Sequence, residues 1–178
     1  MCLENNLAIS SNPAFDVGNL IFRETPSHDD PEKVRAIVEA TGFFSEEEVE
    51  ISVELVRERL SRGIESGYYF LFAEDNKGKL VGYTCYGPVT GTESSFDLYW
   101  IVVDNDSRGY GTGKLLDSKT VELIREMCGT RIYAETSSRE QYEPTRAFYR
   151  KAGYHETACL EDFYAPDDGK IIFVKKVV

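Results

Sequence analysis

The sequence predicts a single α/β domain (α+β in arrangement) spanning residues 1–178, with a mixed, mostly antiparallel sheet of about six or seven strands flanked by about four helices. A chain of 178 residues, 42% of them hydrophobic, is sufficient for one domain with a substantial core. Apolar residues recur at helical spacing in some segments and form short strand-like runs in others. Strands joined by tight turns must be antiparallel, whereas strands flanking a helix can be parallel, so we expect a mixed sheet and not a doubly wound one.

The first third of the chain predicts one short strand and two helices. The first 15 or so residues are polar, and we expect them to be loosely ordered. A short strand is expected at residues 20–23. Asp30, followed by a proline, is suited to cap a helix that stops at Gly42. A capping box beginning at Ser45 opens a second, longer helix with apolar residues at helical intervals.

Three strands are expected next. Residues 68–73 are almost continuously apolar and aromatic, which is typical of a buried strand. Residues 75–78 have the composition of a hairpin turn. The return strand is expected at 80–86 and is ended by a Gly-Pro pair. The run 96–103 is so rich in aromatic and β-branched residues that we expect a central strand.

The remaining elements are a helix, a strand, a helix and a hairpin. Residues 109–113 open the first of these helices, and 131–136 form the strand. The last helix is expected to end at 150–153, because basic residues followed by glycine favour a helix C-terminus. Residues 154–163 and 171–177 are expected to pair as a terminal hairpin. The order is therefore strand, two helices, three strands, helix, strand, helix and two strands.

The charge balance restricts the class of partner. The chain has 31 acidic and 20 basic residues and a formal net charge of −11. Such a chain repels polyanions, so we expect neither nucleic acid nor anionic membranes as partners. No apolar run approaches the roughly 20 residues of a membrane span, and the N-terminus lacks the pattern of a signal peptide. We therefore expect a cytoplasmic protein.

The cysteines and histidines suggest neither a metal site nor a nucleophilic triad. The cysteines are scattered, without metal-ligand spacing, and we expect them to be reduced and structural. The two histidines, His28 and His155, are far apart and adjoin no Ser or Cys motif, which gives no support to a hydrolase. The four cysteines are Cys2, Cys85, Cys128 and Cys159.

A glycine-rich loop between the central strand and the following helix carries the first chemical signal. Gly109, Gly111 and Gly113 alternate, so no side chain keeps a ligand from the backbone. The first amides of a helix have no internal partner, and the helix dipole is positive there. Together these features predict a pyrophosphate cradle of main-chain N–H groups, to which Arg108 and Lys114 add positive charge.

Two better-known phosphate motifs do not fit this loop. A dinucleotide-binding fingerprint needs a further glycine or alanine where Lys114 or Leu116 stands. A nucleotide-hydrolysing loop needs Ser or Thr after Gly-Lys, and Leu115 is there instead. It also needs a leading glycine where Arg108 stands. The remaining alternative is a tight turn that only starts a helix.

Two segments in the right order resemble the signatures of the GNAT superfamily of N-acetyltransferases. Residues 102–113 are similar to its acetyl-CoA motif, Gln/Arg-x-x-Gly-x-Gly/Ala, with Arg108 at the first position. Residues 148–154, Phe-Tyr-Arg-Lys-Ala-Gly-Tyr, resemble its second signature, Phe-Tyr-x-x-x-Gly-Phe/Tyr. The resemblance covers roughly residues 65–178, and earlier residues match only in element order. It implies a GNAT-like fold with acetyl-CoA as cosubstrate and no metal.

The resemblance also implies how the cofactor is held. In the family, the strand before the loop diverges from the next parallel strand, and its open backbone pairs with the amides of the pantetheine arm. The loop and the start of the helix bind the pyrophosphate. The cofactor-binding residues implied in this way are Ile101, Val102, Val103, Arg108, Gly109, Tyr110, Gly111, Thr112, Gly113 and Lys114.

By the same resemblance, Tyr149 is the general acid. The amine attacks the thioester directly, and a phenol with a pKa near 10 can protonate the leaving thiolate. The general base is less defined by the sequence. Asp97 in the central strand is our candidate, with Glu93 and Glu135 as alternatives; each of the three is also compatible with a solvated or structural role.

The acceptor is the part that the sequence defines least. Ribosomal-protein N-terminal acetyltransferases, a branch of the superfamily, have a glutamate where this chain has Ser137. Tyr142 and Thr145 also replace residues common in the family, Asn and Ala. These differences favour a small-molecule primary amine. Acetylation of protein N-termini or lysines, or a non-catalytic acyl-CoA-binding module, remain alternatives. The oligomeric state is open, with a homodimer among the options.

Overall fold

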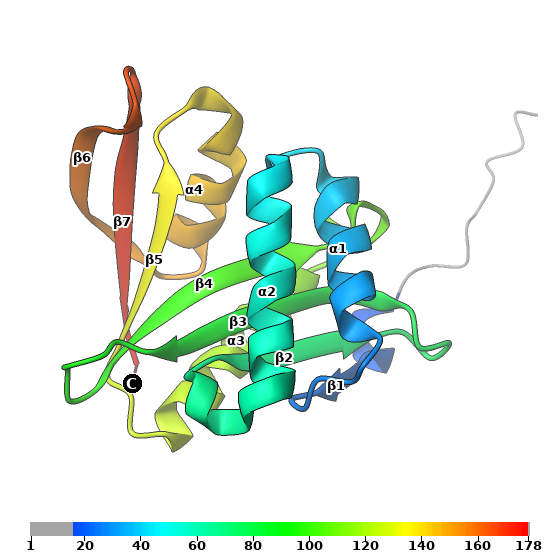
Figure 1. Ribbon diagram of the computed structural model, residues 1–178. Helices are drawn as coiled ribbons and strands as arrows, with labels where there is room; N and C mark the ends of the chain where they lie inside the picture. Colours follow the sequence, from blue (N-terminus) through cyan, green and yellow to red (C-terminus); the bar gives the residue numbers. More distant parts are fainter. Residues whose placement is uncertain (1–15, 178) are drawn as a thin grey trace, which may run out of the picture.

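The computed structural model describes residues 16–177, which form a seven-stranded sheet with helices on both faces (Figure 1). The strands are β1 (Ile21–Arg23), β2 (Tyr69–Glu74), β3 (Leu80–Pro88), β4 (Ser95–Val103), β5 (Arg131–Ser137), β6 (His155–Ala165) and β7 (Asp168–Lys176). The α-helices are α1 (Asp30–Thr41), α2 (Glu46–Arg62), α3 (Thr112–Glu126) and α4 (Glu143–Lys151). The expectation for the first 15 or so residues falls outside the described range.

The strand order is β1-β2-β3-β4-β5-β7-β6. Neighbouring strands are antiparallel except β4 and β5, which are parallel and joined through α3. The predicted mixed, mostly antiparallel sheet and the predicted order of elements are therefore confirmed. The last strand in sequence, β7, lies between β5 and β6 and not at the edge of the sheet.

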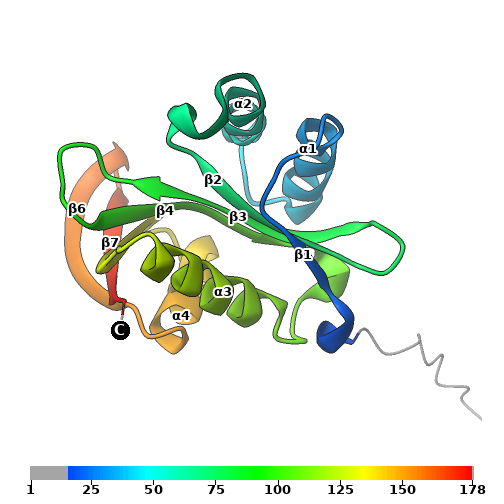
Figure 2. The same cartoon turned by 90° about the horizontal axis from the view of Figure 1, so that it is seen from below.

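The helices form two layers, with α1 and α2 on one face of the sheet and α3 and α4 on the other (Figure 2). The side chains of β2 explain why both faces are covered. Phe70 and Phe72 join a buried cluster with Val34 and Val56 of α1 and α2, whereas Leu71, which points the other way, joins one with α3. A strand whose alternate residues are all apolar must be covered on both sides.

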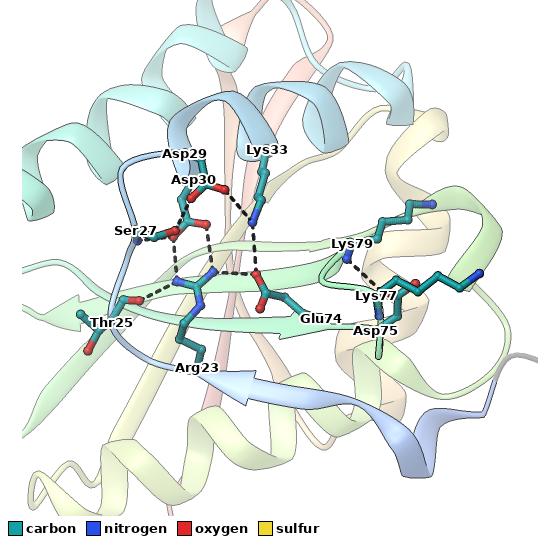
Figure 3. A network of polar contacts seen from close by, with 10 residues as sticks. All are labelled: Arg23, Thr25, Ser27, Asp29, Asp30, Lys33, Glu74, Asp75, Lys77 and Lys79. Atoms are coloured by element: carbon teal, nitrogen blue, oxygen red, sulfur yellow. Dashed lines mark hydrogen bonds and ion pairs between the residues drawn. The ribbon is translucent and has the colours of Figure 1, made fainter.

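The N-terminus of α1 differs from the sequence expectation. Asp30 does not cap the helix; it is its first residue, and the N-cap is Asp29. The fully buried Asp30 carboxylate accepts hydrogen bonds from both terminal nitrogens of Arg23 and from the backbone N–H of Ser27 (Figure 3). Arg23 also forms an ion pair with Glu74 of β2. Asp30 therefore joins α1 to the β1–β2 edge. Because Arg23 binds its carboxylate, the carboxylate does not cap the helix.

The parallel strands β4 and β5 separate soon after they meet. They pair over only three positions, the last of which is Asp97 opposite Tyr133. Beyond that point β4 continues to Val103, no strand among residues 16–177 pairs with it on this side, and the two strands diverge (Figure 1). A β-bulge at Tyr99, the unpaired residue in the register with β3, lies just after the point of separation. Such bulges bend a strand, which is consistent with β4 turning away from β5.

A buried polar contact joins α3 to the terminal hairpin. The Asp117 carboxylate accepts a hydrogen bond of 2.9 Å from the Tyr154 hydroxyl. Its other oxygen lies 2.6 Å from the Lys175 ammonium. The Asp117 side chain is almost inaccessible to solvent, so both partners are needed to offset the cost of burying its charge. This contact keeps α3 fixed against β7.

Candidate active site

A cavity of about 570 Å³ occupies the side of β4 from which β5 has diverged. Its walls come from the end of β4, the loop and first turn of α3, the α4 segment and the connection between α1 and α2. The sequence-predicted residues that line it are Ile101, Val102, Val103, Arg108, Gly109, Gly111, Thr112, Gly113 and Lys114. Tyr110, also predicted, is not among the lining residues, and its side chain is 55% exposed.

The glycines of the loop allow the backbone to face this cavity. Gly109 and Gly111 have φ angles of 82° and 94°, in the region that favours glycine. A Cβ atom at either residue would meet no atom of the described residues within 4 Å. Gly111 is the N-cap of α3, so the amides that follow it have no intrahelical acceptor. Open space therefore lies next to a helix N-terminus, which is the physical requirement for anion binding.

Three cations at the cavity have no carboxylate partner within residues 16–177: Arg108, Lys114 and Lys151. In a chain of net charge −11, unpaired cations on one cavity favour a polyanionic ligand there. The Arg108 Nε donates to the backbone carbonyl of Val103 at 3.2 Å. Its guanidinium carbon lies 5.4 Å from the centre of the Phe43 ring. The residues therefore fit a pyrophosphate-containing cofactor.

Aromatic residues from two distant segments close the cavity. Phe43 and Phe44, in the connection between α1 and α2, line it together with Tyr142, just before α4. The Tyr142 hydroxyl donates to the Phe43 carbonyl at 3.4 Å, and their ring centres are 6.4 Å apart. Phe44 lies against Trp100 of β4, with ring centres 4.9 Å apart. Partial burial raises the pKa of Tyr142, so its hydroxyl stays protonated.

These aromatic residues, like Phe148 and Lys151 of α4, are lining residues that were not predicted from the sequence. Tyr142 had a signal, since it replaces the family's asparagine. Phe148 belongs to the second signature, and a Cβ on Gly113 would lie 3.3 Å from its ring. Phe43 and Phe44 had no signal, because only the fold brings their connection over β4.

Tyr149 is placed in the core and not on the lining of the cavity. Its ring lies 5.2 Å from that of Tyr154 and 5.3 Å from that of Phe173. The same buried cluster contains Phe96 and Leu98, the β4 residues on either side of Asp97. Burial first, and then the charge of Asp117, raise the pKa of Tyr149. Tyr149 therefore lies beneath the point at which β4 and β5 separate.

Asp97 lies at that same point but on the other face of β4, since side chains alternate along a strand. Its side chain is half-buried, and its pKa is raised, mainly by burial and then by the charge of Glu135. The charge of Lys170 acts in the opposite direction. The structure therefore brings Asp97 and Tyr149 close to one point of the sheet without placing them in one cavity.

The other base candidates have different surroundings. Glu135 forms an ion pair of 2.5 Å with Lys170, whose ammonium also lies 3.9 Å from the centre of the Phe163 ring. Glu93 is exposed in the connection between β3 and β4.

No helix in the described part of the chain is long and apolar enough to cross a membrane. Within the same residues, no group of three or more His, Cys, Asp or Glu is placed to hold a metal ion.

Comparison with known proteins identifies the family. The family model of the acetyltransferase (GNAT) domain matches residues 66–156. A crystal structure of a GNAT-family protein from Desulfovibrio desulfuricans is 41% identical, with a TM-score of 0.87 over 89% of this chain and 99% of that chain. The chain belongs to the GNAT acetyltransferase family. Its fold is the GNAT fold, and the cosubstrate of the family is acetyl-CoA.

More distant GNAT structures share the fold alone. An aminoglycoside 6′-N-acetyltransferase complexed with coenzyme A is 19% identical, with a TM-score of 0.71 over 89% of this chain and 97% of that chain. Ard1 from Thermoplasma volcanium is 21% identical, with a TM-score of 0.70 over 90% of this chain and 99% of that chain. A search of curated proteins finds no significant match.

Proposed function

We propose that this GNAT protein transfers the acetyl group of acetyl-CoA to a primary amine of a small molecule by direct attack. The observation that carries the proposal is the side of β4 beyond Asp97 that β5 leaves, which borders a cavity with a helix N-terminus and three cations that have no carboxylate partner within residues 16–177. Bound acetyl-CoA supplies a thioester that is activated toward amines. The α3 amides, Arg108 and Lys114 hold the pyrophosphate. The backbone of residues 101–103, in which the Val103 carbonyl already accepts from Arg108, holds the pantetheine amides.

Tyr149 is the proposed acid. Its raised pKa keeps the phenol protonated at neutral pH, so Oη has a proton to donate when the thiolate leaves. Its buried cluster contains Phe96 and Leu98 of β4, next to the point at which β4 and β5 separate. The amine nitrogen forms a bond to the carbonyl carbon, the carbon–sulfur bond breaks, and the sulfur takes the Tyr149 proton.

Asp97 is the proposed base. It accepts the proton that the attacking amine loses, and it does so through water because it does not line the cavity. The raised pKa of its carboxyl group lies closer to neutral pH than that of an ordinary aspartate, which suits a group that takes up and releases a proton. Tyr99 and Tyr68, whose rings are 5.5 Å apart, lie beside it.

The surroundings of Tyr164 favour a cationic acceptor. Partial burial raises the pKa of this tyrosine to about 12, and the charges of Glu135, Asp168 and Glu48 contribute. Two of these carboxylates are already paired, Glu135 with Lys170 and Asp168 with Arg139, and the Lys170 ammonium lies 5.7 Å from the centre of the Tyr164 ring. The carboxylates still outnumber the cations here, which favours an amine. The aminoglycoside acetyltransferases of the same fold are consistent with a small-molecule acceptor.

One observation argues against a protein N-terminus as the acceptor. Ser137, which stands where ribosomal-protein N-terminal acetyltransferases have glutamate, donates to the buried carboxylate of Asp168 at 2.5 Å and accepts from the backbone N–H of Arg139 at 3.0 Å. The residue therefore anchors the loop after β5 and offers no carboxylate to a peptide.

The test begins with release of free thiol from acetyl-CoA in the presence of amine and peptide panels. We expect turnover with small primary amines. Turnover confined to peptides would establish protein acetylation instead. Binding of acetyl-CoA without turnover above the uncatalysed rate would establish an acyl-CoA-binding module.

Tyr149→Phe then tests the acid. We expect kcat to fall by about 10²–10⁴-fold, the usual contribution of a general acid, with unchanged affinity for acetyl-CoA. The matched control is Tyr83→Phe, which removes another buried phenol, on the α1–α2 side of the sheet. An undiminished rate in the Tyr149 variant would exclude Tyr149 as the acid.

A further inference from the structure

Lys151 is a cation of the cavity that neither the glycine loop nor the proposed chemistry uses. It is the last residue of α4 and lines the same cavity as Gly111 and Lys114, together with Phe148 and Ala152. Its side chain is exposed. No acidic group in the described range lies within ion-pair distance of its ammonium. It is therefore available to an anion in the cavity.

A comparison with Arg150 shows that facing the cavity without an ion pair is particular to Lys151 among the basic residues at the end of α4. Arg150 is also basic and also in the last turn of α4, where a cation interacts favourably with the helix dipole. Its guanidinium, however, forms ion pairs with Glu143 at 2.9 Å and Glu156 at 3.4 Å, and it does not line the cavity. The dipole therefore accounts for a basic residue at either position, but not for an unpaired one that faces the cavity.

The charges of the proposed cofactor leave one group without a partner. In the proposed function, the N-terminus of α3, Arg108 and Lys114 bind the pyrophosphate. Coenzyme A also carries a phosphomonoester on the 3′ oxygen of its ribose, with a charge of about −1.5 to −2 at neutral pH. Lys151 belongs to a different helix from the pyrophosphate-binding amides and lies on the same cavity.

We propose that Lys151 binds the ribose 3′-phosphate and thereby gives the protein its preference for coenzyme A over 3′-dephospho-coenzyme A. This inference rests on the proposed use of acetyl-CoA. A lysine is well suited to the contact, because its ammonium is a compact charge on a flexible stem and can follow a phosphate at the mouth of a cavity. The phosphate contact is electrostatic and exposed, so it weakens as ionic strength rises.

The test measures the dissociation constants of coenzyme A and 3′-dephospho-coenzyme A by calorimetry, at fixed ionic strength. We expect the protein to prefer coenzyme A by about tenfold, the value of one charge-assisted contact of about 1.4 kcal/mol. Lys151→Gln should weaken coenzyme A binding by about tenfold and leave dephospho-coenzyme A binding unchanged. Arg150→Gln, the matched control, should retain the preference.

Each result separates the possibilities. Equal weakening of both ligands in Lys151→Gln would place the lysine on the pyrophosphate and overturn the proposal. An unchanged preference for coenzyme A would also overturn it and leave Lys151 as a helix-terminal cation. Binding with the expected preference but without amine acetylation would uphold the proposal and refute the catalytic function. Failure to bind either ligand would refute both.

Discussion

Replacing Gly111 by alanine tests whether the loop backbone is shaped for a phosphate. Gly111 has a φ angle of 94° and a ψ angle of 1°, a conformation that costs a residue with a Cβ atom roughly 1–2 kcal/mol. The smaller conformational freedom of alanine in the unfolded chain returns about 0.4–1 kcal/mol. We therefore expect a net loss of about 1 kcal/mol of stability, which lowers the Tm of a domain of this size by about 2–4 °C.

The expected effect on affinity is larger than the effect on stability. The new methyl group meets no atom of residues 16–177 within 4 Å, and Gly111 is the N-cap of α3, so the methyl group is expected to stand beside the unpaired α3 amides. It would keep a pyrophosphate away from one amide. Loss of one hydrogen bond to a charged group costs about 1.5–3 kcal/mol, which corresponds to about 10–150-fold in the dissociation constant of coenzyme A.

Calorimetric titration with coenzyme A and thermal unfolding measure the two effects. The control is Gly91→Ala, at a glycine with a φ angle of 81° that also has nothing within 4 Å of a new Cβ atom but lies in the connection between β3 and β4, away from the cavity. It should lose similar stability and keep its affinity. Unchanged coenzyme A binding by the Gly111 variant would refute the phosphate-binding role of the loop.

Two further predictions concern buried polar groups. Tyr154→Phe removes the hydroxyl that donates to Asp117 and leaves Lys175 as the partner of this carboxylate. Urea denaturation should show a free energy of unfolding lower by about 2 kcal/mol. A decrease below about 0.5 kcal/mol would contradict the hydrogen bond. Asp97→Asn should stabilise the protein at pH 7, because a pKa raised on folding means that the ionised form opposes folding. That gain should shrink as the pH falls through the raised pKa and disappear below the unfolded value of about 3.9, so equal gains at pH 7 and at about pH 3 would refute this sign.

The parts of the site that the sequence could predict are those made by consecutive residues. The glycine loop is local: its glycines permit a backbone that faces a ligand, and the helix that follows supplies unpaired amides. The side chain of Tyr110 is exposed, but its predicted contact is through the main-chain N–H, so its role stays a prediction. The starting residue of α1 was also wrong by one position, since Arg23, from β1, takes the Asp30 carboxylate.

The parts that could not be predicted depend on which elements the fold brings together. Phe43 faces Tyr142 across a separation of 99 residues, and no pattern in either segment implies the other. Asp97 and Tyr149 were assigned to one reaction from a motif and a strand, but the face on which a residue lies depends on the register of the whole sheet. Lys151 becomes distinct from Arg150 only when the helix is placed against the cavity.

The position of β7 has a consequence for how the protein is made. This strand follows β6 in the chain but inserts between β5 and β6, and Phe173 within it supports Tyr149 of α4. On the ribosome, β5 and α4 therefore emerge before the strand that pairs with one and supports the other. Until β7 is synthesised, β5 presents an unpaired edge that a second nascent chain can bind. The wall of the cofactor cavity that α4 supplies is thus fixed only late in translation, although every residue that lines the cavity has already been made.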